Sequence, residues 1–578
     1  MENDLMKYDL LMLNITRDGS YVSPGFRESI GQHLIASYVN KHDFKAKTYA
    51  GYATGCKLVI ENEIQVNQVD NIGLYCSCDN YNIVRNIVIW LKTEFRVNVF
   101  VGGPQAVALK EKFLRETNCD AVVVGEGEAA VLELLEYYVD GYGSLRRIGN
   151  LRFIDGQYGY VENDIREPIK DLDAIPFPDM DNSLNQRYKT GDSIGIITGR
   201  GCPYACAFCY EGAHSKNVRY RSLDNVFKEI DEMMVRNPNI KFLCIYDDTF
   251  TLDPDRVHEF CKRMRKMGKK LNWFCEGHVQ TLLKNPDMIE DMISSGLVSM
   301  QIGIESGSRR VLEAYKKQIT PQMIIDVVKL CKKFGLASLT GNFIVGGAFE
   351  TLETLNESIA LAKELIRHGV GMLECRTVFL ALYPDTPMSS NPEGFGIYAL
   401  EEQNKKSVVT MHNSVVRTKA LARNDIIKLK KQFDRVIAEE YRKQAKKADK
   451  QTVLSCFKIQ NKEDTINSVW KSTFLSFRHI KNFLEIAEED RKCRESCGRE
   501  KIRSLYPVRT FELLEYDRNE ALCLEGLKFT GMEKLILENA VGACNLEELS
   551  GICGTDAETV ERVCEKLNDR CLLYYSNF

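Results

Sequence analysis

The stretch "SIGIITGRGCPYACAFCYEG" (Ser193–Gly212) decides the fold, because a β-rich run leads directly into a loop with three closely spaced cysteines. The run before Gly199 predicts a strand, so the loop lies at that strand's carboxyl end. Cys202, Cys206 and Cys209 are too few for a four-ligand zinc site. Three thiols also cannot all pair as disulfides. The loop therefore points to a group that takes three sulfur ligands and keeps one position open.

The sequence that follows the cysteine loop alternates strands with helices. Amphipathic patterns such as Pro254–Gly268 and Pro321–Gly335 separate the apolar runs. Six strand–helix pairs of this kind predict a partial parallel (β/α)6 barrel over residues 191–400, with its chemistry at the carboxyl ends of the strands. After the first strand, further strands are expected in the segments 241–250, 272–278, 298–306, 339–347 and 372–384.

Residues 1–145 show the same alternation and predict a separate domain, α/β and doubly wound (Rossmann-like). Strands are expected in 8–16, 67–78, 97–103 and 119–128, with helical patterns between and after them. Ligands of such sheets bind outside the carboxyl ends of the strands, where glycine lets the backbone approach closely. The glycines at or near these ends are Gly102, Gly103, Gly125 and Gly127.

The rest of the chain divides into three further parts. Residues 146–190 predict an extended connector, with a hairpin that turns at Asp155-Gly156 and prolines that disfavour helix. Residues 401–509 are helical, and their interspersed acids and bases favour a solvated face over an RNA-binding patch. Residues 510–578 predict a hairpin, three helices and a strand, a small winged-helix-like domain.

The bulk composition excludes some function classes. The chain has 578 residues, a net charge of -4, 44% hydrophobic and 27% charged residues, which is ordinary for a soluble globular protein and gives no argument for nucleic acid or membrane partners. The start lacks the pattern of a signal peptide, and no apolar run is long enough to span a bilayer. Twenty cysteines suggest a reducing, anaerobic cytoplasm, with most thiols acting as buried small hydrophobes.

Two cysteines near the carboxyl end leave alternatives open. Cys493 and Cys497 either ligate an auxiliary cluster together with Cys456 or Cys523, or are free thiols, which the scattered spacing favours.

The cysteine loop resembles the signature of the radical S-adenosylmethionine (radical SAM) family, which has this C-x3-C-x2-C spacing with an aromatic residue before the third cysteine. The resemblance implies that Cys202, Cys206 and Cys209 hold a 4Fe-4S cluster, whose open iron binds SAM, and that Phe208 lies near the adenine. It also implies an external electron donor such as flavodoxin or ferredoxin. The alternative is a zinc site with His214 as fourth ligand.

Strand-end segments downstream resemble those that face SAM in this family. "YDDTF" (Tyr246–Phe250), "GIESG" (Gly303–Gly307) and "GNFIVGGAFET" (Gly341–Thr351) carry the candidates, although Ala348 and Phe349 replace the usual proline and glycine. For the aspartates, helix capping or a buried hydrogen bond is an equal alternative. The predicted SAM contacts are Glu305, Asp247, Asp248 and Gly346.

One histidine stands where relatives often carry arginine. His278 ends the segment 272–278, at the carboxyl end of an expected strand. We predict a catalytic role for it in contacting the substrate or transferring a proton, with a structural histidine as the alternative.

The amino-terminal domain resembles that of radical SAM enzymes with a cobalamin-binding domain, the class B methyltransferase-like group. The resemblance rests on "VGGPQA" (Val101–Ala106), "VVVGEGEAAVLELL" (Val122–Leu135) and "DLDAIPFPD" (Asp171–Asp179). The sequence has no Asp-x-His-x-x-Gly motif, whose histidine would be the lower axial ligand of cobalt. Enzymes of this class commonly lack that motif. The alternative is a sheet that serves only as a scaffold. Implied cobalamin contacts are Ser23, Arg27, Cys76, Ser77, Gly102, Gly103, Pro104, Gly125, Glu126, Gly127 and Glu128.

These resemblances imply a cobalamin-dependent radical SAM methyltransferase that methylates a carbon centre of a small molecule or a peptide. A ribosomal peptide is a candidate because the last domain loosely resembles leader-peptide-binding modules, which add a strand to a sheet edge; a helical cap over the barrel is the alternative. Two other functions remain open: a non-methylating rearrangement or cyclisation with the same cofactors, and a non-catalytic peptide-binding protein with an inert cluster.

Overall fold

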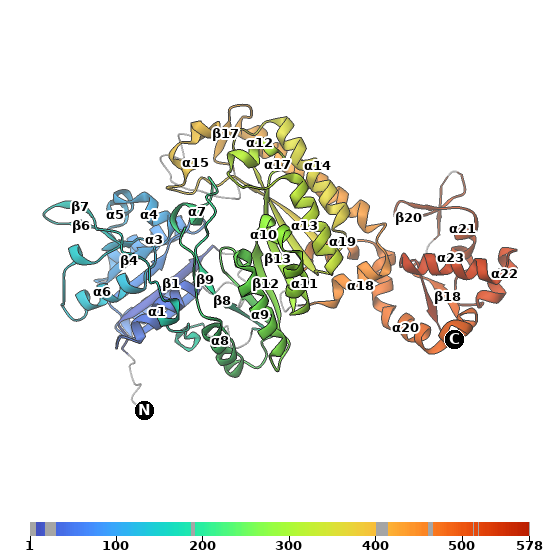
Figure 1. Cartoon of the computed structure of the whole chain (residues 1–578), viewed down its shortest axis with the longest axis horizontal. Coiled ribbons are helices and arrows are strands. Elements are labelled where there is room, and N and C mark those ends of the chain that lie inside the picture. Colours follow the sequence, from blue (N-terminus) through green and yellow to red (C-terminus); the bar gives the residue numbers. More distant parts are fainter. Residues whose placement is uncertain are drawn as a thin grey trace. The chain divides into compact units, whose positions relative to one another are not determined.

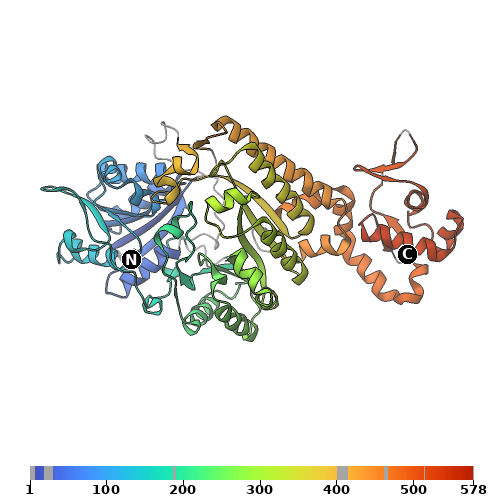
Figure 2. The same cartoon turned by 45° about the horizontal axis from the view of Figure 1, so that its top comes forward.

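The computed structural model describes residues 7–17, 30–185, 191–399, 414–460, 466–512, 514–517 and 519–576, without the side chains of 496–501. Ser23 and Arg27, predicted to contact cobalamin, lie outside the described residues. The chain forms two compact units (Figures 1 and 2). One contains residues 1–327, 342–358 and 377–431, and the other contains residues 328–341, 359–376 and 432–578.

The first unit begins with a seven-stranded sheet, which confirms the predicted doubly wound fold. The first five strands in the chain pair in parallel, and the last two continue the sheet in antiparallel pairs. The order across the sheet is β2 (Ala46–Tyr52), β1 (Leu10–Thr16), β3 (Asn71–Tyr75), β4 (Asn98–Gly102), β5 (Ala121–Val123), β6 (Leu151–Asp155) and β7 (Gly159–Glu162).

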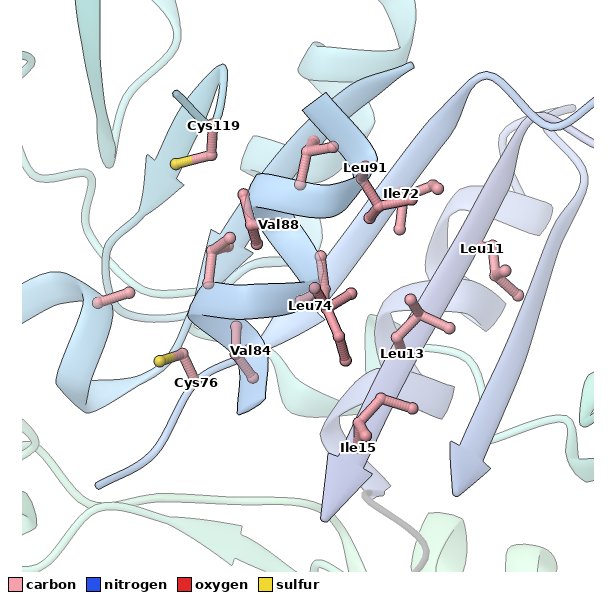
Figure 3. Packing of buried hydrophobic residues seen from close by; sticks show 14 of the residues in the cluster. Leu11, Leu13, Ile15, Ile72, Leu74, Cys76, Val84, Val88, Leu91 and Cys119 are labelled. Atoms are coloured by element: carbon pink, nitrogen blue, oxygen red, sulfur yellow. The ribbon is translucent and has the colours of Figure 1, made fainter. Parts of the chain in front are cut away.

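Both faces of this sheet are covered by helices, so it has two apolar cores. On one face, α3 buries Val84, Val88 and Leu91, at helical spacing, against Leu74 of β3 (Figure 3). On the other face, the buried residues come from the two helices α1 and α6 and from the sheet. The helices are α1 (Ile30–Asn40), α2 (Cys56–Gln65), α3 (Tyr81–Glu94), α4 (Pro104–Leu109), α5 (Glu111–Thr117) and α6 (Glu128–Tyr138).

Sequence reasoning missed one strand–helix pair in this domain. Strand β2 reads "AKTYAGY" and has no run of large apolar side chains, because it is an edge strand and buries only Ala46 and Thr48. The predicted hairpin at Asp155-Gly156 is present, but it belongs to the sheet as β6 and β7. Part of the segment predicted as a connector therefore extends the sheet.

A second sheet has six strands and carries the cysteine loop, as the partial barrel requires. All six strands lie in the predicted segments to within one residue, and neighbouring strands from β8 through β11 and β12 to β13 pair in parallel. Strand β8, which leads into the loop, is at one edge. The order is β15 (Leu373–Phe379), β14 (Ser338–Val345), β13 (Leu297–Glu305), β12 (Asn272–Gly277), β11 (Phe242–Ile245) and β8 (Ser193–Ile196).

Helices and short strands connect these six strands. Helix α8 begins at the N-cap Ser222, whose hydroxyl accepts a bond from Asn225 N–H, and α9 begins in the same way at Asp253. The elements are β9 (Gly199–Arg200), α7 (Tyr210–His214), β10 (Arg219–Tyr220), α8 (Leu223–Arg236), α9 (Pro254–Lys266), α10 (Val279–Lys284), α11 (Pro286–Ser294), α12 (Arg309–Ala314), α13 (Pro321–Phe334), α14 (Leu352–His368), α15 (Pro387–Ser390), β16 (Ile397–Ala399) and β17 (Val416–Thr418).

The end of the chain is helical and then mixed, as predicted. A carboxyl-terminal core includes Leu522, Leu546 and Tyr575. Strands β18 and β22 pair antiparallel, and β19, β20 and β21 form a second antiparallel sheet. The elements are α17 (Arg423–Ala445), α18 (Lys450–Lys458), α19 (Ser468–Leu475), α20 (Arg478–Lys501), β18 (Tyr506–Arg509), β19 (Glu515–Tyr516), β20 (Leu522–Leu524), β21 (Leu527–Phe529), α21 (Gly531–Asn539), α22 (Leu546–Cys553), α23 (Ala557–Asp569) and β22 (Leu573–Ser576).

Of the helices in the described ranges, none combines the length and the apolar character that a bilayer crossing requires.

Candidate active site

The cysteine loop leaves the barrel sheet at the carboxyl end of β8. The antiparallel pair β9–β10 closes the loop at its base, and the Cys202 N–H donates to the Ser215 carbonyl at 2.8 Å. Gly201 has a φ of 94°, and a Cβ there would lie 2.5 Å from the carbonyl oxygen of Asn217. The tight turn before the first cysteine therefore requires glycine.

The donor set of the loop fits a cuboidal cluster. Cys206 is buried, and Cys202 and Cys209 are partly exposed. No three His, Cys, Asp or Glu side chains in the described segments converge as the ligands of a single ion must. A cuboidal cluster makes a different demand, because each iron takes one thiolate and the ligands stand around a larger body. Three thiols on one loop meet this demand and leave one iron without a protein ligand.

Burial acts against ionisation of the loop thiols. It raises the pKa of the Cys209 thiol to about 11, and it also raises the pKa of Cys206, where the charge of Lys317 opposes the shift. Thiolates at these positions are favoured by positive charge close by. The irons of a cluster supply such charge, and Lys317 supplies another part of it.

Asp247 and Asp248 hold the loop in place from the end of β11. Asp247 is buried and accepts hydrogen bonds from the N–H and the hydroxyl of Thr198, both at 2.6 Å. Burial raises the pKa of Asp247 to about 6. Asp248 accepts from the Gly201 N–H at 3.0 Å. These bonds match the buried-hydrogen-bond alternative that the sequence left open, and contact of either carboxylate with SAM stays a prediction.

Phe208 is anchored beside the cysteines. Its ring meets the ring of Tyr315 edge to face, with centroids 5.0 Å apart. The neighbouring Ala207 donates its N–H to the Tyr315 carbonyl at 3.0 Å and accepts from Met388 N–H at the same distance. The loop is thus fixed immediately before Phe208, and the predicted contact with adenine stays a prediction.

Glu305 forms a buried ion pair that the sequence did not predict. Its Oε1 lies 2.9 Å from Nζ of Lys317, and the two side chains are 8% and 11% exposed. Glu305 has a φ of 61°, a strained conformation for a non-glycine residue. Gly303 leaves space for the pair, because a Cβ there would lie 2.1 Å from Glu305 and 2.5 Å from Lys317.

The charge of Lys317 is retained in spite of its burial. Burial lowers the pKa of its ammonium group, but Glu305 and the nearby Cys206 raise it by more, so the net pKa is higher than usual. Nothing in the sequence distinguishes Lys317 from its neighbour Lys316, because only the tertiary structure buries one of them.

His278 is buried and stacks on a residue of the cysteine loop. Its ring lies 3.8 Å from that of Tyr204, with an interplanar angle of 15°. Neither ring nitrogen has a hydrogen-bond partner within the described part of the chain. Burial lowers the pKa of His278 to about 3, so its imidazole is neutral at physiological pH. Two nitrogens with unmet hydrogen-bonding capacity suit a ligand contact, which remains a prediction.

Glu276 is a further candidate that the sequence reading missed. It lies two residues before His278 on β12, so the two side chains leave the strand on the same face. Gln301 Nε2 donates to its Oε1 at 3.1 Å. Burial raises the pKa of Glu276 to about 7, and the charge of Asp248 adds to the shift. The period-two spacing of Glu276 and His278 was the available signal.

Gly346 turns the chain at the end of β14. It has a φ of 84°, and its N–H donates to Oε2 of Glu350 at 2.6 Å. Burial raises the pKa of Glu350 to about 7. The predicted contact of Gly346 with SAM stays a prediction.

The predicted cobalamin edge lies at the ends of β3 and β4. Gly103 has a φ of 103°, and a Cβ there would lie 2.6 Å from the Cys76 carbonyl oxygen. That carbonyl accepts from the Gln105 N–H, next to Pro104. The Cys76 thiol lies in the apolar core, so only its backbone reaches the edge (Figure 3). The Ser77 N–H donates a hydrogen bond to Oδ1 of Asn80 at 2.8 Å.

The end of β5 combines open space with charge. Gly125 has a φ of 72°, and a Cβ there would meet no atom within 4 Å, so the backbone at this position is open. Gly102 likewise has only the Val123 carbonyl, at 3.8 Å, near the position of a Cβ. At Gly127 a Cβ would approach Ile35 to 3.0 Å. These features fit a corrin ring resting on the edge, and each predicted contact stays a prediction.

Glu126 and Glu128 are paired with arginines of the β9–β10 ribbon. Arg200 Nη1 lies 3.1 Å from Glu126 Oε2, and its Nη2 lies 2.6 Å from Glu128 Oε1. Glu126 also binds Arg219. These contacts join the edge of the first sheet to the base of the cysteine loop.

Three of the candidate auxiliary cysteines have separate surroundings, and the side chain of the fourth, Cys497, lies outside the described part of the structure. The Cys456 thiol donates to the Gly371 carbonyl at 3.0 Å. Cys493 lies in the carboxyl-terminal apolar core, and the Cys523 thiol contacts the Ala521 carbonyl at 3.6 Å.

Two family profiles match the chain. The B12 binding domain matches residues 22–135, and the Radical SAM superfamily matches residues 196–362. An uncharacterized methyltransferase of Pyrococcus horikoshii is 38% identical over 275 residues, 46% of this chain and 58% of that protein. The anaerobic magnesium-protoporphyrin IX monomethyl ester cyclase of Cereibacter sphaeroides is 27% identical over 272 residues, 45% of this chain and 44% of that protein. The chain spans about half the length of these relatives.

Two solved structures share the fold. OxsB, a cobalamin-dependent S-adenosylmethionine radical enzyme with aqua-cobalamin and S-adenosylmethionine bound, has a TM-score of 0.61 at 16% identity and covers 85% of this chain and 76% of that chain. TsrM from Kitasatospora setae, a radical S-adenosylmethionine methyltransferase, has a TM-score of 0.54 at 16% identity and covers 68% of this chain and 78% of that chain. At this identity the likeness concerns the fold alone.

Proposed function

The chain is a radical SAM protein with an amino-terminal B12-binding domain, and from this premise we propose that it is a methyltransferase acting on a carbon centre through methylcobalamin and a 5′-deoxyadenosyl radical. Its cofactors are a 4Fe-4S cluster, SAM and cobalamin. The methyltransferase name of the Pyrococcus horikoshii relative supports the proposal. When bound, these groups supply an organic radical and a transferable methyl group.

One observation carries the proposal. The base of the cysteine loop contacts the edge of the B12-binding sheet directly, through Arg200 and the two glutamates Glu126 and Glu128. A radical site and a methyl-carrying site must lie close together, because a substrate carbon that has lost its hydrogen atom has to reach the methyl group.

The residues of the chain divide the work of positioning. Cys202, Cys206 and Cys209 hold the cluster, and Asp247 and Asp248 fix the loop that carries them.

Glu305, with Lys317, offers a charged pair for the polar end of SAM. His278 offers two unpartnered nitrogens to a substrate or a proton. Gly102, Gly103 and Gly125 let a corrin ring approach the backbone of the first domain.

We propose a peptide as the substrate, with a ribosomal peptide as the leading case. The support is the carboxyl-terminal domain, in which β19, β20 and β21 form a small antiparallel sheet beside three helices. A peptide can add a strand to the edge of such a sheet. An external flavodoxin or ferredoxin is proposed as the electron donor, in a cytoplasm that the cysteine content suggests is reducing.

A second function has one observation in its favour. The Cereibacter sphaeroides relative is named a cyclase, so cyclisation or rearrangement with the same cofactors is the alternative. Anaerobic reconstitution with iron, sulfide, hydroxocobalamin and methyl-labelled SAM separates the two. Label found on cobalamin together with 5′-deoxyadenosine supports methyl transfer. 5′-Deoxyadenosine without label on cobalamin supports the alternative, and a fully loaded protein that forms neither product overturns both.

A further inference from the structure

Two arginines stand directly opposite each other at the base of the cysteine loop. In the β9–β10 ribbon, Arg200 and Arg219 are register partners. Their side chains are 16% and 13% exposed. Like charges directly opposite in an antiparallel pair repel, and burial strengthens the repulsion. The ribbon therefore needs negative charge from elsewhere.

That charge comes from the first domain. Glu126 binds both arginines, at 3.1 Å from Arg200 Nη1 and 3.2 Å from Arg219 Nη1, and it makes a second, shorter contact with Arg219 Nη2. Glu128 binds Arg200 at 2.6 Å and is only 4% exposed. We call these four residues, Arg200, Arg219, Glu126 and Glu128, the interdomain clamp.

The clamp lies between two cofactor sites. Glu126 directly follows Gly125, where a Cβ would meet no atom within 4 Å, at the sheet edge that is predicted to contact cobalamin. Arg200 is two residues before Cys202, and the intervening Gly201 is bonded to Asp248. Only a few backbone bonds thus separate each end of the clamp from a group that would touch a cofactor.

We propose that the clamp couples the two sites, so that cobalamin at the sheet edge increases the affinity of the cysteine loop for SAM, with Arg200 as the positioning residue. The inference rests on the proposed function for the identity of the two cofactors. A ligand seated over Gly125 restricts the turn that carries Glu126 and leads into α6, whose first residue is Glu128. Fixed carboxylates fix Arg200, and this in turn orders the first turn of the cysteine loop. SAM then binds a loop that is already ordered and loses less conformational entropy.

Linkage makes the proposal quantitative. If cobalamin lowers the dissociation constant of SAM by a factor, SAM must lower that of cobalamin by the same factor. Coupling of this kind is typically about 5- to 150-fold, and we expect about tenfold here. The factor is measured by equilibrium dialysis of labelled SAM against anaerobically reconstituted protein, with and without hydroxocobalamin. The SAM-induced change in the spectrum of the reduced cluster provides a second readout.

The decisive variant is Glu126→Gln with Glu128→Gln, which keeps shape and removes charge. Because Glu126 and Glu128 are also implied cobalamin contacts, the affinity of this variant for each cofactor alone is measured first. We expect the coupling factor, taken relative to those affinities, to fall to about one. Arg200→Lys keeps the positive charge but cannot form the bidentate contacts of a guanidinium group. We expect its coupling factor to lie between that of the wild type and one. The matched control is Glu229→Gln, which breaks the buried pair of Arg221 and Glu229 within the barrel domain; its coupling factor should equal that of the wild type.

Three results would overturn the inference. The first is a coupling factor of one in the wild-type protein. The second is a double glutamine variant whose coupling factor equals that of the wild type. The third is a Glu229→Gln control that loses as much coupling as the double variant. If the double variant holds neither cofactor alone, Arg200→Lys decides, and a wild-type factor there refutes the clamp. Failure of the proposed function looks different, because it appears as loaded protein without methyl transfer, whereas coupling is read from binding alone.

Discussion

The ring of His278 lies parallel to the ring of Tyr204, with centroids 3.8 Å apart, so a strand end of the barrel is stacked directly on the cysteine loop. Tyr204 is further held by Thr281, whose hydroxyl oxygen lies 3.2 Å from the tyrosine oxygen. The stack leaves both nitrogens of His278 without a partner in the described structure. His278 therefore packs against the loop and also has two ring nitrogens that can bind a ligand or a proton. Substitutions can separate these two roles.

Replacing His278 with Phe is expected to keep the stack and remove the nitrogens. If His278 transfers a proton, product formation should fall by about 10²- to 10⁴-fold, while the spectrum of the reduced cluster stays the same. His278→Ala is the comparison, because it removes both the stack and the nitrogens and should also disturb the cluster. Equal activity of His278→Phe and wild type would assign the residue a structural role only.

The same histidine predicts a pH dependence of stability. Burial lowers the pKa of His278 to about 3, whereas the unfolded chain binds the proton near pH 6.5. Between these values the unfolded state holds more protons, so stability falls as pH falls below 6.5. From pH 7 to pH 5 the wild type should lose about 2 kcal/mol more than His278→Phe. Denaturant titrations of cofactor-free protein at both pH values measure this, and parallel losses would contradict it.

Removing the lysine of the buried Glu305–Lys317 ion pair is expected to lower the stability of the folded protein. Lys317→Met leaves Glu305 buried without a partner, which should destabilise the protein by about 3–5 kcal/mol. Adding Glu305→Gln removes the stranded charge and should recover much of that loss. Denaturant titration of the single and double variants tests the pair, and strictly additive losses would show that the two residues do not interact.

Lys317 should also influence the cluster, because its charge acts on Cys206. Loss of the positive charge of Lys317 favours the oxidised cluster, whereas loss of the negative charge of Glu305 favours the reduced one, and Lys317 acts more strongly on Cys206. The two effects cancel in part, so we expect the reduction potential of Lys317→Met with Glu305→Gln to fall by at most about 50 mV. Potentiometric titration followed by electron paramagnetic resonance measures the shift. Lys317→Arg is the control and should keep the potential of the wild type.

Replacing Cys206 with Ala is expected to abolish SAM cleavage and leave cobalamin binding largely unchanged, because the two cofactors belong to different domains. Deoxyadenosine release and the visible spectrum of bound hydroxocobalamin report the two sites separately. Loss of both in a folded variant would contradict this division between domains.

Gly103→Ala is expected to lower cobalamin loading. The φ of 103° strains any other residue, and the added Cβ would lie 2.6 Å from the Cys76 carbonyl, at a cost of about 1–3 kcal/mol. Gly141→Ala is the matched control, because its φ is 70° and its Cβ would meet no atom within 4 Å. Wild-type loading of both variants would show that Gly103 does not shape the cofactor edge.

The sequence predicted the fold well where patterns are long and local. All six barrel strands lie in the expected segments to within one residue, and the cysteine loop follows β8 as the β-rich run before it indicated. It missed β2, because an edge strand with little apolar surface has no clear alternation. It also treated β6 and β7 as part of a connector, since a hairpin pattern does not say which sheet it joins.

The site was predicted less completely. The glycines and cysteines could be named from the sequence because special backbone conformations and ligand chemistry require those residue types, and their contacts with cofactors stay predictions. Lys317 and Glu276 were missed, because a lysine or a glutamate becomes unusual only once it is buried. Asp247 and Asp248 were named as SAM contacts, and the structure shows in addition that both bind the loop backbone.

By itself, the sequence determined the order of the barrel strands and the set of thiols that the three-cysteine loop offers, because periodicity and ligand spacing are local properties. Only the tertiary structure decided which charges meet. Glu305 pairs with Lys317, twelve residues away in sequence, and Glu126 pairs with Arg219, 93 residues away. The reason is physical: the strength of an ion pair and the protonation of a side chain depend on what covers them, and that covering comes from parts of the chain that are distant in sequence.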